Sequence, residues 1–280
     1  MKPITRAAKP ADFRGIQALL DYENRVHRHL DWRTPMDWLG TQPFTVLEVD
    51  NVIQAAFACP DDPPGVSWIR LFAALPHVDL RESWQHLLAA TCQTITAPIQ
   101  QIYSVAVKSW FTMLLLESNF KLHQTIVVLH RNIPFSCPDD DKKGIQIRRM
   151  KPDDLEEVTK VDQSSFEKLW QNSLQGTKFA FNESSYATVV LAADQIVGYQ
   201  ISSNTQINAH LARIAVLPEM QGRGIATSLT RNLLHHYSRR GIGYITVNTQ
   251  NDNEASLKLY EKMGFERSGD RFPVLQLDIK

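Results

Sequence analysis

The clearest pattern of apolar and polar positions lies between residues 210 and 240. Leu211–Leu217 is a short apolar run with β-branched residues, which is typical of a buried strand. Pro218 ends this run because proline cannot donate to a ladder. Leucines then recur at helical spacing, at Leu229, Leu233 and Leu234. The pattern predicts a strand that runs through a loop into a helix.

The same order of elements follows directly afterwards. Residues 244–249 form a second run rich in β-branched residues, and residues 255–263 have apolar positions at helical spacing. Asn253 suits the N-cap of that helix, and Gly264 suits the left-handed position that ends it. The chain therefore predicts a second strand and a second, shorter helix.

The loop before the first helix carries candidate chemistry. It reads Gln221-Gly222-Arg223-Gly224, and the helix that follows begins with unpaired backbone N–H groups and a partial positive charge. Glycines let an anion approach those donors. The glycine spacing is neither that of a P-loop nor that of a dinucleotide-binding fold. The loop predicts a phosphate or pyrophosphate site, with an ordinary loop-to-helix turn as the alternative.

Taken together, the strand, Q-G-R-G-I-A, the helix, the next strand, the asparagine and L-Y-E-K-M-G-F resemble the acetyl-coenzyme A signature of the GNAT N-acetyltransferase superfamily. The resemblance covers about 60 residues well and, more loosely, residues 145–280. It implies that acetyl-CoA is a co-substrate whose acetyl group passes directly to a primary amine. No covalent enzyme intermediate is then needed, so the lack of a nucleophile–base pair is no objection.

The resemblance also implies the residues that hold the cofactor. The backbone of Ile214, Ala215 and Val216 is expected to pair with the pantetheine arm, and a backbone N–H near Val216 is expected to stabilise the oxyanion. The pyrophosphate is expected at the loop and the helix start, on Gln221, Gly222, Arg223, Gly224, Ile225, Ala226 and Thr227. Asn253 matches a cofactor-contacting asparagine, and a plain N-cap is the alternative.

Proton transfer needs an acid and a base. Tyr260 matches the family's general acid, which contacts the cofactor and protonates the leaving thiolate, because a phenol with a pKa of about 10 keeps its proton at neutral pH. The alternative is a core tyrosine. The branch that acetylates ribosomal-protein N-termini has a glutamate where this chain has Asn248, which cannot act as a base. His210 is the leading candidate base, with Glu183 and Tyr199 as alternatives, and no metal site is predicted.

A repeat indicates that the chain contains two copies of one domain. The pattern Arg6, Lys9, Pro10, Asp12 returns about 142 positions later as Arg148, Lys151, Pro152, Asp154. A period this long means duplicated domains and excludes a solenoid. We therefore expect a mixed α/β fold of two tandem GNAT-like domains, each a central mixed β-sheet flanked by helices. The predicted boundaries are 1–135 and 145–280, joined by a polar linker at 136–144.

The first copy lacks the residues of the site. Opposite the glycine loop stands Asp79-Leu80-Arg81-Glu82, whose side chains block the backbone donors and whose carboxylates repel an anion. Leu115 stands opposite Tyr260, and Asn119 stands opposite Gly264, where it can still take the left-handed conformation. We expect this copy to bind no acetyl-CoA and either to wall the substrate cleft or only to stabilise the chain. The layout is similar to that of mycothiol synthase.

Composition adds limits on partners and compartment. The 280 residues carry 30 basic and 30 acidic side chains, so the formal net charge is zero. This balance indicates no broad positively charged surface for nucleic acid or an anionic membrane. The N-terminus has no apolar signal core, and no apolar run is long enough to span a bilayer. The widely spaced Cys59, Cys92 and Cys137 favour reduced thiols in a cytoplasmic protein.

The sequence thus predicts an N-acetyltransferase with an active C-terminal domain. A small-molecule amine is the favoured acceptor, such as an amino sugar, a polyamine or an amino-acid derivative, because the extra domain can enclose it. The alternatives are a protein or peptide Nα- or lysine acetyltransferase, and an acetyl-CoA-binding protein without catalytic activity. We expect a monomer or a homodimer.

Overall fold

The structure is a computed structural model that describes residues 3–95, 98–133 and 145–279. The predicted linker at 136–144, with Cys137, lies outside these residues. Within the described parts of the chain, no helix combines the length and the apolar character that crossing a bilayer requires.

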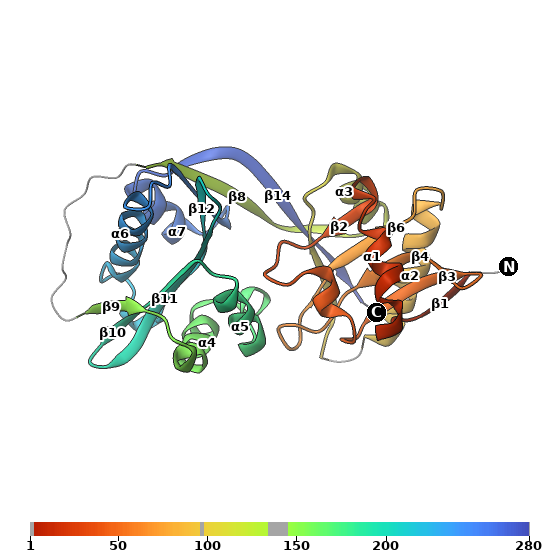
Figure 1. Cartoon of the computed structure of the whole chain (residues 1–280), viewed down its shortest axis with the longest axis horizontal. Helices are drawn as coiled ribbons and strands as arrows, with labels where there is room; N and C mark the ends of the chain where they lie inside the picture. The colour runs from red at the N-terminus through yellow and green to blue at the C-terminus, as the bar shows by residue number, and fades with distance from the viewer. Residues whose placement is uncertain (1–2, 96–97, 134–144, 280) are drawn as a thin grey trace. The chain divides into compact units, whose positions relative to one another are not determined.

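The chain divides into two compact units. Unit 1 comprises the chain up to Gln124 together with the residues from Phe272 onward, and unit 2 comprises Thr125–Arg271. Two strands, β8 (Lys121–Asn132) and β14 (Glu266–Asp278), each pass from one unit into the other (Figure 1). This division differs from the predicted boundaries, which kept β8 in the first domain and β14 in the second.

Strand pairing explains the difference. The second part of β8 pairs antiparallel with β13 (Tyr244–Gln250) of unit 2, and the end of β14 pairs antiparallel with β7 (Gln101–Val105) of unit 1. The last strand of each copy therefore completes the sheet of the other copy. A change of partner within a continuous strand leaves no break in composition, so the sequence pattern did not mark it.

Unit 2 has a mixed sheet in the order β14-β8-β13-β12-β11-β10-β9, in which β12 and β13 are parallel. Its other elements are β9 (Gln146–Arg149), α4 (Leu155–Ser165), α5 (Leu174–Asn182), β10 (Tyr186–Ala192), β11 (Gln195–Asn204), β12 (Asn208–Val216), α6 (Ile225–Ser238) and α7 (Glu254–Lys262). A hairpin joins β10 and β11, with Ala193 and Asp194 both at positive φ in the turn.

Helices cover both faces of this sheet. The Tyr199 hydroxyl of β11 donates to Asp162 of α4, whereas the Ser202 hydroxyl of the same strand lies 2.9 Å from the Tyr237 hydroxyl of α6. These two strand residues are an odd number of positions apart, so they face opposite sides of the sheet. Figure 1 accordingly shows α4 and α6 on opposite sides of β11.

Unit 1 repeats the architecture with one strand added. Its five-stranded sheet has the order β1-β3-β4-β6-β2, and β5 and β7 pair in parallel beside β14. The elements are β1 (Ile4–Ala7), α1 (Phe13–Leu19), β2 (Val26–Arg28), β3 (Phe44–Val49), β4 (Val52–Ala58), β5 (Ser67–Trp68), β6 (Leu71–Ala74), α2 (Leu80–Thr94), β7 and α3 (Ser109–Glu117). Phe57, Phe72, Trp84 and Phe111 form the aromatic centre of its core.

The repeated motif makes the same contact in both units. Arg6 binds Asp12 through two hydrogen bonds of 2.7 and 2.8 Å, and Arg148 binds Asp154 through two of 2.6 and 2.8 Å. Each aspartate also accepts from the backbone N–H three residues earlier, at 2.7 Å. The shared contact explains why these residues recur, and the predicted mixed α/β fold is confirmed.

Candidate active site

The site begins where two neighbouring strands of unit 2 separate. β12 and β13 pair in parallel only as far as Leu211↔Val247, although β12 continues to Val216. Ala212 is an extra residue in β12, because the register with β11 shifts at this point. Such a bulge bends a strand and increases its twist, which accounts for the separation.

The separation leaves a strand edge beside the gap. Leu217 donates its N–H to Val197 of β11 at 2.9 Å. Because hydrogen-bond direction alternates along an antiparallel strand, the backbone groups of Ile214 and Val216 point away from β11, toward the side that β13 has left. An extended ligand could pair with this edge as an added strand.

A pocket of about 560 Å³ follows the edge. Its walls come from β12, the loop after it, the first turn of α6, the outer face of α7 and the end of α4. The lining residues are Ser165, Phe166, Ile214, Ala215, Val216, Met220, Gln221, Gly222, Gly224, Ile225, Ala226, Thr227, Asn253, Ala255, Ser256, Lys258, Leu259 and Lys262. All of the predicted cofactor-binding residues line the pocket except Arg223 and Tyr260.

The glycine loop presents an uncapped helix end to this pocket. Gly222 and Gly224 have φ values of 73° and 77°, a left-handed conformation that other residues adopt at a cost of about 1–2 kcal/mol. Gly224 is the N-cap of α6 and has no side chain to cap it; the first intrahelical bond runs from Ser228 N–H to the Gly224 carbonyl, at 3.0 Å. The N–H groups of residues 225–227 therefore have no acceptor within the helix, which makes this helix end suitable for an anion.

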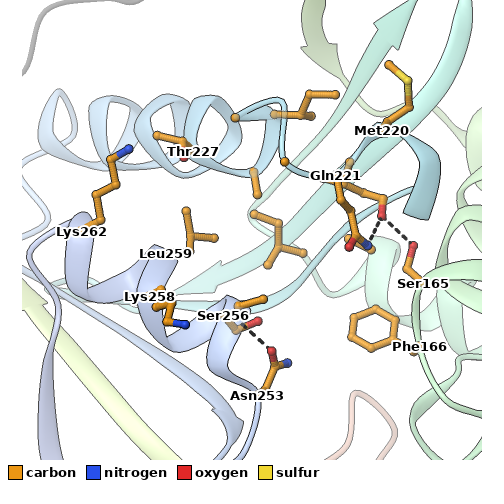
Figure 2. Close-up of a pocket in the computed structure, with 18 residues that line it drawn as sticks. Ser165, Phe166, Met220, Gln221, Thr227, Asn253, Ser256, Lys258, Leu259 and Lys262 are labelled. Carbon is orange, nitrogen blue, oxygen red and sulfur yellow. Dashed lines mark hydrogen bonds between the residues drawn. The ribbon is translucent and has the colours of Figure 1, made fainter.

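Two side chains fix the start of the loop. Gln221 Nε2 and Ser165 Oγ each donate to the Val216 carbonyl at 3.0 Å, as Figure 2 shows. Since this carbonyl is at the end of β12, the two bonds tie the loop and the end of α4 to the strand edge. Ser165 was not among the predicted site residues.

Asn253 both caps α7 and lines the pocket. Its Oδ1 accepts from the Ser256 N–H at 3.1 Å, which is the N-cap contact predicted from the sequence (Figure 2). The two predicted roles are therefore compatible in geometry.

One face of α7 contributes residues that the sequence reading missed. Ala255, Lys258, Leu259 and Lys262 line the pocket, and Figure 2 shows the last three across from Thr227 of α6. Their spacing marks a single helix face. The sequence reading emphasised the opposite, apolar face and so overlooked the two lysines. Both carry positive charge at a site suited to phosphate.

Tyr260 lies on the buried face of α7. Its side chain is 2% exposed and packs near the Phe265 ring, with the ring centres 5.6 Å apart. Burial raises the pKa of Tyr260, so the phenol keeps its proton at neutral pH as an acid must. It is not among the pocket-lining residues, although its neighbour Leu259 is. The catalytic role of Tyr260 stays a prediction.

None of the candidate bases lines the pocket. His210 is half-buried on β12, with Nδ1 2.8 Å from Thr246 Oγ1, and burial lowers its pKa, so it is neutral near pH 7. Glu183 is exposed at the end of α5. Tyr199 is fully buried, and burial raises its pKa well above the ordinary value, so it holds its proton and does not suit a base.

Arg223 is not among the residues that line the pocket. It is exposed, and its Nη2 donates to the Glu219 carbonyl at 3.1 Å. Its contact with the pyrophosphate stays a prediction.

The comparison with known proteins agrees with this arrangement. The model of the acetyltransferase (GNAT) family matches residues 155–265, which include the bulged strand, the glycine loop and α7. Unit 2 contains a GNAT-family acetyltransferase domain.

Curated relatives match parts of the chain, and a solved structure shares the fold of the whole chain. The domain is 33% identical over 87 residues to N-alpha-acetyltransferase 30 of Schizosaccharomyces pombe, covering 29% of this chain and 58% of that one. It is 41% identical over 54 residues to mycothiol acetyltransferase of Rhodococcus jostii, covering 19% of this chain and 18% of that one. These segments span less than two thirds of either relative. A tandem GNAT protein from the clavulanic acid biosynthesis pathway shares the fold of the chain at a TM-score of 0.64 and 12% identity, covering 100% of this chain and 98% of that one.

Proposed function

We propose that unit 2 transfers the acetyl group of acetyl-CoA to a primary amine. The observation that carries the proposal is the strand edge of β12, which leads directly to the uncapped, glycine-lined start of α6. This geometry supplies hydrogen-bond partners for two parts of the cofactor. The pantetheine arm would pair with the backbone of Ile214 and Val216, and the pyrophosphate would bind the N–H groups of residues 225–227.

The acetyl group passes directly from the sulfur to the amine, by addition of the amine and then loss of the thiolate. The amine nitrogen attacks the acetyl carbonyl carbon, the carbonyl oxygen takes up negative charge, and the C–S bond then breaks. The Val216 N–H, on the edge facing the pocket, is the proposed donor to that oxygen. Tyr260 is the proposed proton donor to the thiolate, since burial keeps its hydroxyl protonated. The amine gives up its proton to a base that we leave unassigned.

We favour a small-molecule amine as the acceptor. A mycothiol acetyltransferase and an N-alpha-acetyltransferase are both similar to this domain, so a protein N-terminus is the second candidate. Asn248, exposed on β13, stands where the protein-acetylating branch has a glutamate, and this difference favours the small molecule. A protein that binds acetyl-CoA without turning it over is the third candidate.

Calorimetric titration of acetyl-CoA into the full chain tests the cofactor site. We expect one site per chain in the unaltered protein. In Gly222→Glu we expect at least 100-fold weaker binding, because the added carboxylate would stand beside the pyrophosphate. Gly241→Glu is a matched control: both glycines have φ +73° and open space around an added Cβ, but Gly241 is outside the pocket.

The results of these titrations distinguish between the candidate functions and between the candidate positions of the cofactor. Two sites in the unaltered chain would mean that unit 1 also binds the cofactor. Equal losses in Gly222→Glu and Gly241→Glu would place the pyrophosphate elsewhere. Binding with no acetyl transfer to any amine in a broad panel would favour the non-catalytic candidate.

A further inference from the structure

A buried charged cluster lies at the end of α4, behind the pocket. Asp162 has a fully buried side chain and accepts from Arg213 Nε and Nη2 at 2.7 and 2.9 Å. The Tyr199 hydroxyl and the Asn172 N–H, the latter at 2.7 Å, donate to the same carboxylate. Arg213 Nη2 also donates to the Trp170 carbonyl. We call Asp162, Tyr199 and Arg213 the Asp162 cluster.

The Asp162 cluster touches the pocket wall without lining it. The guanidinium of Arg213 lies 3.8 Å from the centre of the Phe166 ring, and Phe166 lines the pocket. Four donor contacts reach the Asp162 carboxylate, so its acceptor capacity is used within the protein. The cluster is therefore suited to holding structure in place and unsuited to taking a proton from a substrate.

Unit 1 has apolar residues at the same three places. At the separation of the repeat, about 142 positions, the counterparts of the Asp162 cluster are Leu20, Ala56 and Leu71. All three are buried and belong to one apolar cluster. The fold thus forms without the charges. Replacing a buried ion pair by packed apolar residues often leaves stability unchanged or raises it, so stability alone does not explain the charges in unit 2.

The segment after the first helix behaves differently in the two units. In unit 1 it forms β2, which pairs antiparallel with β6, the strand that corresponds to the end of β12. Arg25, just before β2, donates to the Val78 carbonyl at 3.0 Å and fixes the segment there. The chain's own strand thereby covers in unit 1 the edge that borders the pocket in unit 2.

In unit 2 the corresponding segment is held elsewhere. Lys168–Trp170 is a short 3₁₀ turn, and the Asp162 cluster binds its end through the Trp170 carbonyl and the Asn172 N–H. The edge of β12 is left to the pocket. The charged contacts are thus made to the same segment that, in unit 1, enters the groove.

We infer that the Asp162 cluster is a positioning device: it holds residues 166–172 away from the edge of β12 and keeps the groove open for acetyl-CoA. The inference rests on the proposed cofactor site. It assigns to Asp162, Tyr199 and Arg213 a role that acts through the segment they hold and involves no contact with the reacting atoms.

The test is a variant that carries the apolar character of unit 1, Asp162→Leu/Tyr199→Phe/Arg213→Leu. Removing all three polar groups together avoids leaving one buried charge unpaired. Amide hydrogen exchange of Ile214 and Val216 is measured in the ligand-free protein, followed by titration with acetyl-CoA. We expect at least fivefold slower exchange, because the released segment covers the edge, and at least tenfold weaker acetyl-CoA binding.

Whether amide exchange becomes slower or faster distinguishes the positioning role of the Asp162 cluster from a merely structural one. Loss of a stabilising contact opens a protein and speeds exchange, so faster or unchanged exchange at Ile214 and Val216 would overturn the inference. If the unaltered protein failed to bind acetyl-CoA, the proposed function would fall, whereas the exchange measurement would still decide the role of the cluster.

Arg213→Lys provides a second variant should the triple variant fail to fold. Lysine keeps the charge but loses the planar fork that binds Asp162 and Trp170 together. We expect a smaller change in the same direction, about threefold in exchange and in affinity. Arg148→Lys is the matched control, since Arg148 makes the same two-bonded contact with Asp154 and does not line the pocket. Equal effects of Arg213→Lys and Arg148→Lys would overturn the inference.

Discussion

In unit 2 the end of β12 borders a pocket of about 560 Å³, whereas in unit 1 the equivalent strand, β6, pairs with β2 along Leu71–Ala73. In unit 2 the parallel pairing of β12 ends at Leu211, and in unit 1 the parallel partner of β7 is β5, which ends at Trp68 before β6 begins. The separation is therefore a property of the shared fold. What differs is whether the chain itself supplies a partner for the edge that the separation exposes.

The helix that follows shows the same contrast. Gly224 gives α6 no side-chain cap, whereas Asp79 Oδ1 accepts from the Glu82 N–H at 2.8 Å at the start of α2. A carboxylate at this place uses one of the donors that an anion would need and repels the anion as well. The predicted loss of the anion site from the first copy has a direct structural counterpart, and the absence of acetyl-CoA from unit 1 stays a prediction.

The last helix of each unit, α3 in unit 1 and α7 in unit 2, completes the comparison. Where α7 has Lys262, α3 has Glu117, which binds Arg81 through two hydrogen bonds of 2.8 Å. The hollow that remains in unit 1 measures about 360 Å³ and is lined by Asp79, Leu80, Arg81, Trp110, Met113, Leu114 and Glu117. The charged groups at this place in unit 1 thus bind one another, and the prediction that the site of unit 1 is degenerate is consistent with this arrangement.

The largest expected effect concerns Tyr260, whose counterpart in unit 1 is the apolar Leu115. In Tyr260→Phe we expect the turnover number to fall by about 10²–10⁴-fold if proton transfer to the thiolate limits the rate. Thiol release from acetyl-CoA is followed with a panel of primary amines, and calorimetry checks that cofactor affinity is unchanged. Full turnover in this variant would remove the acid role and leave Tyr260 as a core residue.

The next effect concerns the charges on α7. We exchange Lys258→Met and Lys262→Glu together, which brings in the residues of unit 1. Acetyl-CoA binding should weaken by about 10- to 100-fold at low salt and by less at high salt, because exposed charges are screened. Lys160→Met on α4 is the control, since Lys160 is an exposed, ion-paired lysine outside the pocket. A loss that is independent of salt would argue against a phosphate contact.

The smallest effect concerns β2, the strand that covers the groove of unit 1. His27 of β2 is buried and stacks on Phe111 with ring centres 3.9 Å apart, and burial lowers its pKa to about 3. The unfolded chain has the ordinary value of about 6.5, so stability is complete above that pH and falls as the pH drops toward 3. At pH 5.5 the loss is about 1.4 kcal/mol for this histidine.

Urea unfolding at pH 7.5 and 5.5 measures this loss. His27→Gln should reduce the difference between the two pH values, because the variant has no imidazole to protonate at this position. The reduction is compared with that in His86→Gln, which changes an exposed histidine of α2. If His27→Gln and the unaltered protein showed the same pH dependence, His27 would not be held neutral within the fold.

Local features of the fold followed from the sequence. The residues that the repeat singled out make the same Arg–Asp contact in both units, and the left-handed φ of 64° at Asn119 matches that of 75° at Gly264, as predicted. These features depend on a few neighbouring residues and on their allowed backbone angles, so a short stretch of sequence is sufficient to specify them. The glycine loop belongs to the same class, since its suitability for an anion depends on the helix that directly follows it.

Other features depended on which parts of the chain meet in space. A strand of three residues such as β2 carries no periodic signal, and nothing local shows that it will cover β6. The exchange of β8 and β14, the position of Lys258 and Lys262 on the pocket side of α7, and the distance of His210 from the pocket are of this kind. The sequence by itself determined the fold family, the repeat and the anion loop, because these rest on local propensity and spacing. Only the tertiary structure decided which strand edge is open, because an edge is closed by whichever distant segment of the chain packs against it.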